Sequence, residues 1–180
     1  MEKILQSYIR FADAVNENIG KATAWLTTVL VLVVCLHVFM RRFLHTNPAW
    51  ITELEWHIFA LIFLFGAGYA FKHDRHVRVD LFYAKFSKRD KAIVNFVGTL
   101  LFLIPWCILV IIYSYQYAMT SFNINESSPD PGGLPARYLI KFSITIGIVF
   151  LLLQAVGILF RSILTLKEPT IDNEKQTTES

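Results

Sequence analysis

The chain has 180 residues, of which 54% are hydrophobic and only 17% are charged, and its formal net charge is +3. Soluble domains contain about 25% charged residues, so this composition argues against a soluble domain and predicts a membrane protein. The cations lie beside long apolar runs, which also argues against nucleic acid as their partner.

Residues 3–20 carry apolar side chains at helical spacing, among them Ile4, Tyr8 and Ile9. This pattern predicts an amphipathic helix on the cytoplasmic surface of the membrane, with a solvated tail as the alternative. Four apolar runs follow and predict an all-α protein with four transmembrane helices, at residues 22–40, 51–71, 92–119 and 138–160.

The first connection, between spans one and two, gathers charge at the membrane entrance. Glu53 and Glu55 begin span two, where acids are costly unless paired or hydrated. Arg41 and Arg42 lie on the same side, so we predict an ion pair between spans one and two. Asn47 is the predicted N-cap of span two, because Pro48 suits the first helical position.

The second connection is a cationic segment centred on residues 71–83. Asp80 is a predicted cap for a short interfacial helix between spans two and three. The sequence from Ser87 to Asp90 matches a capping box and predicts that span three begins near Lys88. That span is longer than a bilayer requires, so we expect tilt, extension or a kink at Pro105.

The third connection, residues 120–137, contains three prolines and two adjacent glycines, which exclude a regular helix. We interpret residues 1–165 as one transmembrane domain and 166–180 as a disordered tail. Thirteen of the 17 Lys and Arg residues lie before span one, between spans two and three, or after span four. The positive-inside rule therefore predicts that both termini are cytoplasmic, N-in and C-in.

The sequence lacks the GxSxG, HExxH, P-loop and GxGxxG patterns, so we expect no catalytic activity. His37 and His57 lie at comparable depth in neighbouring spans, which would suit bis-histidine haem ligation. A haem-binding membrane anchor of a redox complex is therefore the alternative function, and hydrogen bonds between helices or at the interface are the other interpretation of these histidines. Without charges at mid-membrane depth, the four spans are poorly suited to transport alone. We expect the chain to pack against a larger protein.

Several stretches, in order, resemble the DctQ-like small membrane subunit of tripartite ATP-independent periplasmic (TRAP) transporters. They are RRFL at 41–44, WITELEWHIF at 50–59, GAGYA at 66–70 and HVRVDLFY at 76–83. The loop ESSPDPGGLPARY at 126–138 is similar to the mannitol/chloroaromatic-type branch of that family.

This resemblance implies a multi-pass protein of the bacterial inner membrane that works in a three-part system. A periplasmic binding protein would capture an organic acid, either a carboxylate or a sulfonate, and a large multispanning subunit would carry the substrate and sodium. This chain would hold no cofactor, scaffold the large subunit and help dock the binding protein.

The resemblance also implies roles for particular residues. The large-subunit interface and scaffold would comprise Arg41, Arg42, Trp50, Glu53 and Trp56. The cytoplasmic anchor would comprise His76, Arg78 and Asp80. The periplasmic docking loop would comprise Glu126, Asp130, Gly132, Gly133, Pro135 and Arg137.

Overall fold

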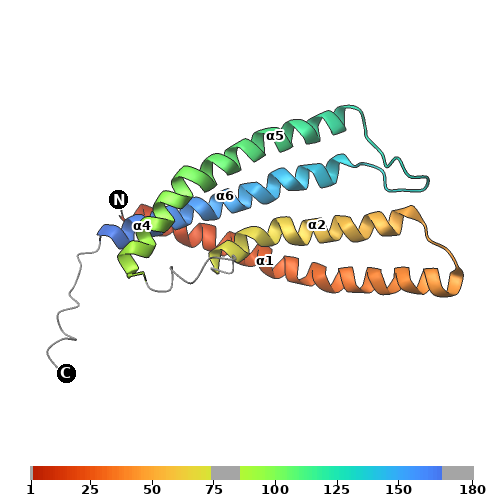
Figure 1. The fold of residues 1–180 in the computed structure, drawn as a ribbon, viewed down its shortest axis with the longest axis horizontal. Coiled ribbons are helices and arrows are strands. Elements are labelled where there is room, and N and C mark those ends of the chain that lie inside the picture. Colours follow the sequence, from red (N-terminus) through yellow and green to blue (C-terminus); the bar gives the residue numbers. More distant parts are fainter. Residues whose placement is uncertain (1, 74–85, 168–180) are drawn as a thin grey trace, which may run out of the picture.

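A computed structural model describes residues 2–73 and 86–167, and every regular element in these ranges is helical (Figure 1). The elements in chain order are α1 (Glu2–Phe39), the π-helical turn η1 (Met40–Leu44), α2 (Ala49–Lys72), α4 (Lys88–Gly98), the π-helical turn η2 (Thr99–Leu103), α5 (Ile104–Asn123) and α6 (Tyr138–Lys167).

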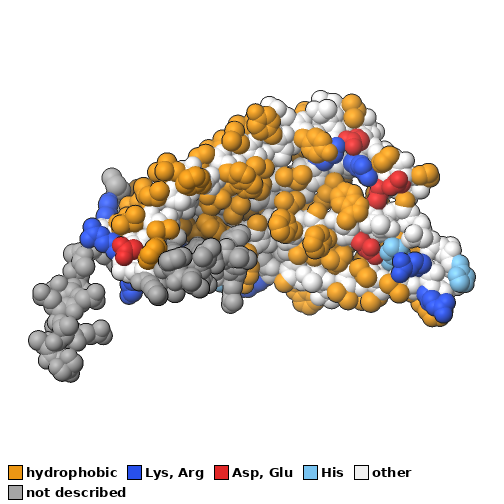
Figure 2. Space-filling model, viewed as in Figure 1, with side chains coloured by type: hydrophobic (Ala, Val, Ile, Leu, Met, Phe, Trp, Pro, Cys, Tyr) orange, Lys and Arg blue, Asp and Glu red, His pale blue; other side chains and the backbone are white. Residues whose placement is uncertain are grey.

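Within the described residues, four helical segments are long and apolar enough to cross a membrane. They cover residues 2–44, 49–72, 88–123 and 138–167, which confirms the predicted all-α fold with four candidate spans. On the face shown in Figure 2, hydrophobic side chains cover the middle of the molecule and charged side chains gather at its two ends. This distribution suits a bundle whose middle lies in hydrocarbon and whose ends meet water.

Helix α6 is the central helix, because it contacts α1, α2, α4 and α5. Small residues let its neighbours approach closely. A Cβ atom added to Gly147 would lie 2.9 Å from the Cβ atom of Leu64 and 3.0 Å from the Leu64 carbonyl oxygen. The backbones of α2 and α6 can therefore meet at this point only because residue 147 has no side chain.

The N-terminal amphipathic segment is not the separate surface helix that we predicted. Helix α1 runs unbroken from Glu2 to Phe39, and its first half packs on α2 and α6 (Figure 1). The Tyr8 hydroxyl donates a hydrogen bond to the Leu153 carbonyl at 3.2 Å, and Ala12 and Asn16 are fully buried. From Tyr8 onward the stripe therefore packs against protein, on α2 and α6, whereas Ile4 is exposed.

The third candidate span, which comprises α4, η2 and α5, begins and bends where the sequence predicts. The Ser87 hydroxyl accepts a hydrogen bond from the Asp90 amide at 3.1 Å, and an Asp90 carboxylate oxygen accepts one from the Ser87 amide at 3.3 Å. This confirms the capping box and the start at Lys88. The chain changes direction between α4 and α5 (Figure 1), where η2 precedes Pro105, a residue without an amide hydrogen. The predicted interfacial helix from Asp80 falls mainly on residues 74–85, outside the described residues.

Both described ends of the chain lie at the same end of the bundle (Figure 1), as four crossings require. Which side of the membrane this end faces stays a prediction from the charge distribution. We call it the terminal end and call the opposite end, with the two helix connections, the loop end.

Candidate functional site

The buried carboxylate of Glu53 is the centre of a polar cluster at the loop end. Glu53 lies near the start of α2 and is only 3% exposed. It accepts hydrogen bonds from the Leu134 amide at 2.5 Å, from Arg137 Nη2 at 3.0 Å and from the Ser128 hydroxyl. A buried carboxylate is tolerated when it is paired and hydrogen-bonded in this way. We call these four residues the Glu53 cluster.

The glycines of the third connection let this cluster form. Gly132 has a φ of +75°, a conformation that disfavours side chains. Gly133 lies against the cluster, since an added Cβ would meet the Ser128 side chain and lie 2.8 Å from Glu53 Oε2. The Gly133 amide also donates to the Asp130 carbonyl at 2.9 Å. The two glycines shape the loop around Glu53, while Asp130 and Pro135 are exposed.

A second ion pair closes the same loop onto α6. Lys141 Nζ lies 2.5 Å from Glu126 Oε2 and 4.0 Å from the centroid of the Tyr117 ring. The hydrogen bond from Lys141 holds the pKa of the Glu126 carboxyl below its ordinary value. Beside this pair is a cavity of about 250 Å³, lined by residues of α2, α5 and α6 that include Trp56 and Tyr117.

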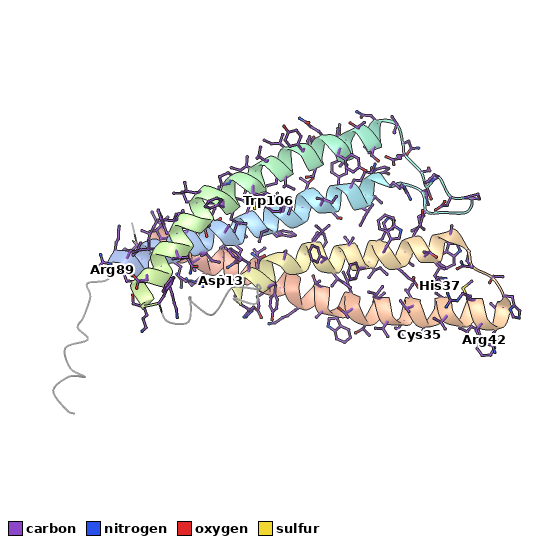
Figure 3. All side chains as sticks on the ribbon, viewed as in Figure 1. Asp13, Cys35, His37, Arg42, Arg89 and Trp106 are labelled. Atoms are coloured by element: carbon purple, nitrogen blue, oxygen red, sulfur yellow. The ribbon has the colours of Figure 1, made fainter. Side chains whose placement is uncertain are left out.

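The predicted ion pair of Glu53 with Arg41 or Arg42 is wrong, because Arg137 takes that position. Neither Arg41 nor Arg42 forms an ion pair within the part of the chain that the structure describes, and both are exposed. Figure 3 shows Arg42 just after α1, at the loop end of the bundle, whereas Asp13 lies towards the terminal end. The π-helical turn η1 carries both arginines.

Glu55, the second acid of α2, instead pairs with a histidine of α1. His37 Nδ1 lies 2.8 Å from Glu55 Oε1, and His37 Nε2 lies 2.7 Å from Asn47 Oδ1. Asn47 is therefore not the predicted N-cap, since α2 begins at Ala49 after Pro48 with no side-chain cap. The interpretation of His37 as a hydrogen-bonding residue between helices is confirmed.

The residues present do not fit the alternative function of haem ligation. Both ring nitrogens of His37 have hydrogen-bonding partners, so neither is free to bind iron. His57 points Nδ1 at the Glu53 carbonyl, 2.5 Å away within the same helix. The expected bond between helices is therefore not made by this nitrogen.

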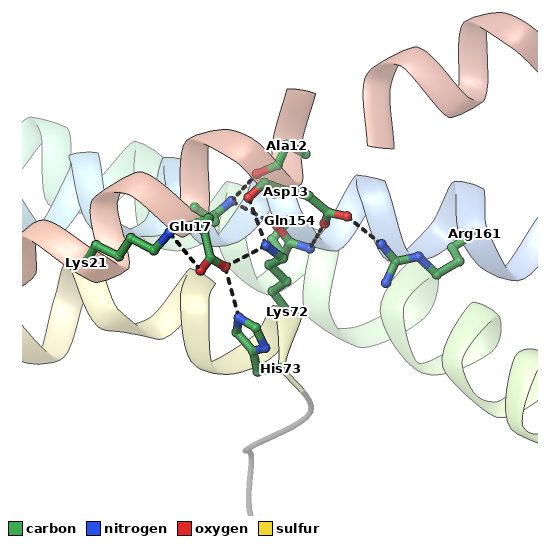
Figure 4. Close-up of polar contacts among 9 residues, drawn as sticks. Ala12, Asp13, Glu17, Lys21, Lys72, His73, Gln154 and Arg161 are labelled. Atoms are coloured by element: carbon green, nitrogen blue, oxygen red, sulfur yellow. Dashed lines mark hydrogen bonds and ion pairs between the residues drawn. The ribbon is translucent and has the colours of Figure 1, made fainter. Parts of the chain in front are cut away.

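At the terminal end, a polar chain joins the first helix to the last (Figure 4). Asp13 lies 2.7 Å from Arg161 and accepts a hydrogen bond from Gln154 at 2.9 Å. Gln154 in turn accepts one from Asn16 at 3.0 Å, and these two amides are fully buried. We call these four residues the Asp13 cluster. Gln154 therefore bonds between helices, the usual role of a deep polar side chain in an apolar helix.

Glu17 links the same region to α2 (Figure 4). It lies 2.7 Å from Lys72 Nζ and 3.0 Å from His73 Nε2. Sequence reasoning missed Asp13, Asn16 and Glu17. Their signal was the interruption of an otherwise apolar helical stripe at i, i+3 and i+4, which marks polar groups facing a partner helix.

Other predicted site residues are placed as follows. Trp50 and Trp56 are exposed on the first two turns of α2, at the loop end. His76, Arg78 and Asp80 lie outside the described residues. Three of the predicted loop residues lie near Glu53 or Lys141: Glu126, Gly133 and Arg137. The third connection, α2 and α6 therefore meet at this point.

Comparison with known families gives a clear match. Residues 30–165 match the family described as tripartite ATP-independent periplasmic transporters, DctQ component. The chain belongs to the DctQ family. No individual curated protein matches it. As a DctQ-family protein, the chain is a transmembrane component of TRAP transport. The match confirms the resemblance at family level.

The matched range includes the whole of the Glu53 cluster but only part of the Asp13 cluster. All four residues of the Glu53 cluster lie within the matched range, which spans 30–165. In the Asp13 cluster, Gln154 and Arg161 lie within it, whereas Asp13 and Asn16 precede it. The first half of α1 is therefore packed on the bundle by residues that the family match does not include.

Proposed function

We propose that this DctQ-family chain is the non-catalytic small membrane subunit of a TRAP-type secondary transporter. It scaffolds the large multispanning subunit and helps dock the periplasmic binding protein during sodium-driven uptake of an organic acid. The system lies in the bacterial inner membrane, with both termini of this chain cytoplasmic. The 126–138 motif supports the mannitol/chloroaromatic-type branch.

The observation that carries the docking role is the attachment of the third connection to α2 through Glu53. Three donors from residues 128–137 converge on one buried carboxylate. A loop fixed in this way loses little conformational entropy when a partner binds it. Its exposed residues, Asp130 and Pro135 among them, form a preorganised surface for the binding protein.

The scaffold role is supported by an aromatic face on α2. Trp56, Phe59 and Phe63 follow one another at helical spacing, and all three are exposed. Exposed Arg41, Arg42 and Trp50 lie at the same end. Aromatic residues and arginine are enriched at protein interfaces, so we assign this face of α2 and the adjacent η1 turn to contact with the large subunit.

Co-purification tests the assignment. The tagged chain is expressed with its large subunit and binding protein, and the amount of large subunit retained is measured. Phe59→Ala with Phe63→Ala should reduce retention, whereas Leu109→Ala with Tyr113→Ala on α5 should not, although these residues are also exposed. The reverse result would move the interface to α5. Sodium-dependent uptake by liposomes containing this chain alone would overturn the accessory role.

A further inference from the structure

A cationic pocket of about 260 Å³ opens at the terminal end, between α2, α4 and α6. Four of its ten lining residues are Lys or Arg, and no described carboxylate is among them. The cations come from three helices: Lys72 ends α2, Lys88 and Lys91 begin α4, and Arg161 lies near the end of α6. Helix packing therefore assembles positive charge that is scattered along the chain.

Two of these four cations contact acids of α1. Glu17 lies 2.7 Å from Lys72, and Asp13 lies 2.7 Å from Arg161. These two contacts hold two of the four cations in place. The first turn of α4 adds Lys88 and Lys91 to the lining, so three helices contribute cations that favour a bound anion.

The rest of the lining is amphipathic. Phe71, Ala92 and Ile158 form apolar walls, and Asn95, Ser162 and Thr165 supply polar groups. The lining residues come from the end of α2, the start of α4 and the last part of α6, which lie at the terminal end (Figure 1). That level corresponds to the headgroup region of a bilayer.

We propose that this pocket binds the phosphate group of an anionic phospholipid. The cations meet the phosphate and the apolar walls meet the glycerol and upper acyl carbons. Basic pockets between transmembrane helices on the cytoplasmic side bind anionic headgroups in this manner. A free phosphate would use the cations and leave the apolar walls without a partner. The assignment to the cytoplasmic leaflet rests on the proposed orientation, whereas the lipid chemistry does not.

The test uses the full chain purified in detergent and titrated separately with phosphatidylglycerol, phosphatidylcholine and inorganic phosphate. Binding is followed by the thermal unfolding midpoint and by lipid adducts in native mass spectrometry. Phosphatidylglycerol should raise the midpoint, as a ligand of the folded state does, and the other two should not. Lys88→Gln with Lys91→Gln should weaken phosphatidylglycerol binding by about tenfold or more.

The matched control removes two cations from the same end that do not line the pocket, Lys3→Gln with Lys167→Gln. It should change the affinity less than about twofold, as expected for surface substitutions away from the site. Lys88→Arg with Lys91→Arg should keep binding, and an unchanged lipid-free midpoint shows that each variant is folded. Equal loss in the control pair, equal binding of phosphatidylcholine, or an equal response to inorganic phosphate would each overturn the proposal.

Discussion

Glu53 and Arg137 are 84 residues apart in the chain and form an ion pair of 3.0 Å. The pair joins α2 to the loop before α6, and the Glu53 side chain is only 4% exposed. Because the same carboxylate also accepts from Ser128 and Leu134, its removal leaves several donors without a partner at once.

Glu53→Ala should therefore lower the free energy of unfolding by about 2–3 kcal/mol. Chemical unfolding in detergent measures this change, and limited proteolysis of residues 124–137 reports the loss of loop order. Glu55→Ala is the control, because the Glu55 side chain is 22% exposed and its ion-pair partner among the described residues is His37. Equal destabilisation by the two variants would contradict a special role for Glu53.

Gly133→Ala should destabilise the loop more than Gly132→Ala. A Cβ at 133 would lie 2.5 Å from the Ser128 Cβ, while a Cβ at 132 would meet nothing within 4 Å and carry only the cost of its positive φ. That conformational cost is about 1–2 kcal/mol. Gly98→Ala, in α4 with open space around it, is the control and should not lower the midpoint, because alanine favours a helix more than glycine does. The unfolding midpoint should be highest for Gly98→Ala, lower for Gly132→Ala and lowest for Gly133→Ala.

Gly68 and Asn16 should show strong coupling in a double-mutant cycle. A Cβ at residue 68 would lie 2.0 Å from Asn16 Oδ1, so Gly68→Ala should cost about 1–3 kcal/mol by overpacking. In an Asn16→Ala background the obstructing side chain is absent and the same substitution should cost less. Additive losses in the cycle, measured by chemical unfolding, would mean that the two residues do not compete for this space.

Acid should loosen the third connection through Glu126. The hydrogen bond from Lys141 lowers the pKa of Glu126 in the folded chain below its ordinary value of 4.5. The ionised carboxylate therefore stabilises the folded loop above pH 4.5, and this contribution is lost as the pH falls through the lowered folded pKa. NMR titration of the Glu126 carboxyl carbon measures that pKa, which Lys141→Gln should return towards 4.5. An identical titration in the variant would assign the shift to another group.

Hydropathy and capping chemistry predicted the four helical segments and the start at Lys88, because both depend on nearby residues. The choice of partner for Glu53 could not be predicted in the same way. Arg41, Arg42 and Arg137 all lie at the loop end, and only the rotation of α2 about its axis decides which of them Glu53 meets. Tertiary packing also determines that residues 8–20 pack on α2 and α6, which the local sequence could not show.

The contacts of the Asp13 cluster can form only late in synthesis of the chain. Asp13 is separated from Gln154 by 141 residues and from Arg161 by 148, so its partners leave the ribosome long after it does. Domains form during synthesis at about 5–20 residues per second, and for most of that time the first half of α1 has no complement for Asp13 and Asn16. Helix α1 is made before α2, α4, α5 and α6, yet its first half is fixed only after α6 has been made. A ribosome stalled before Gln154 would expose a nascent chain whose N-terminal helix is still available to quality-control proteases or to a wrong partner.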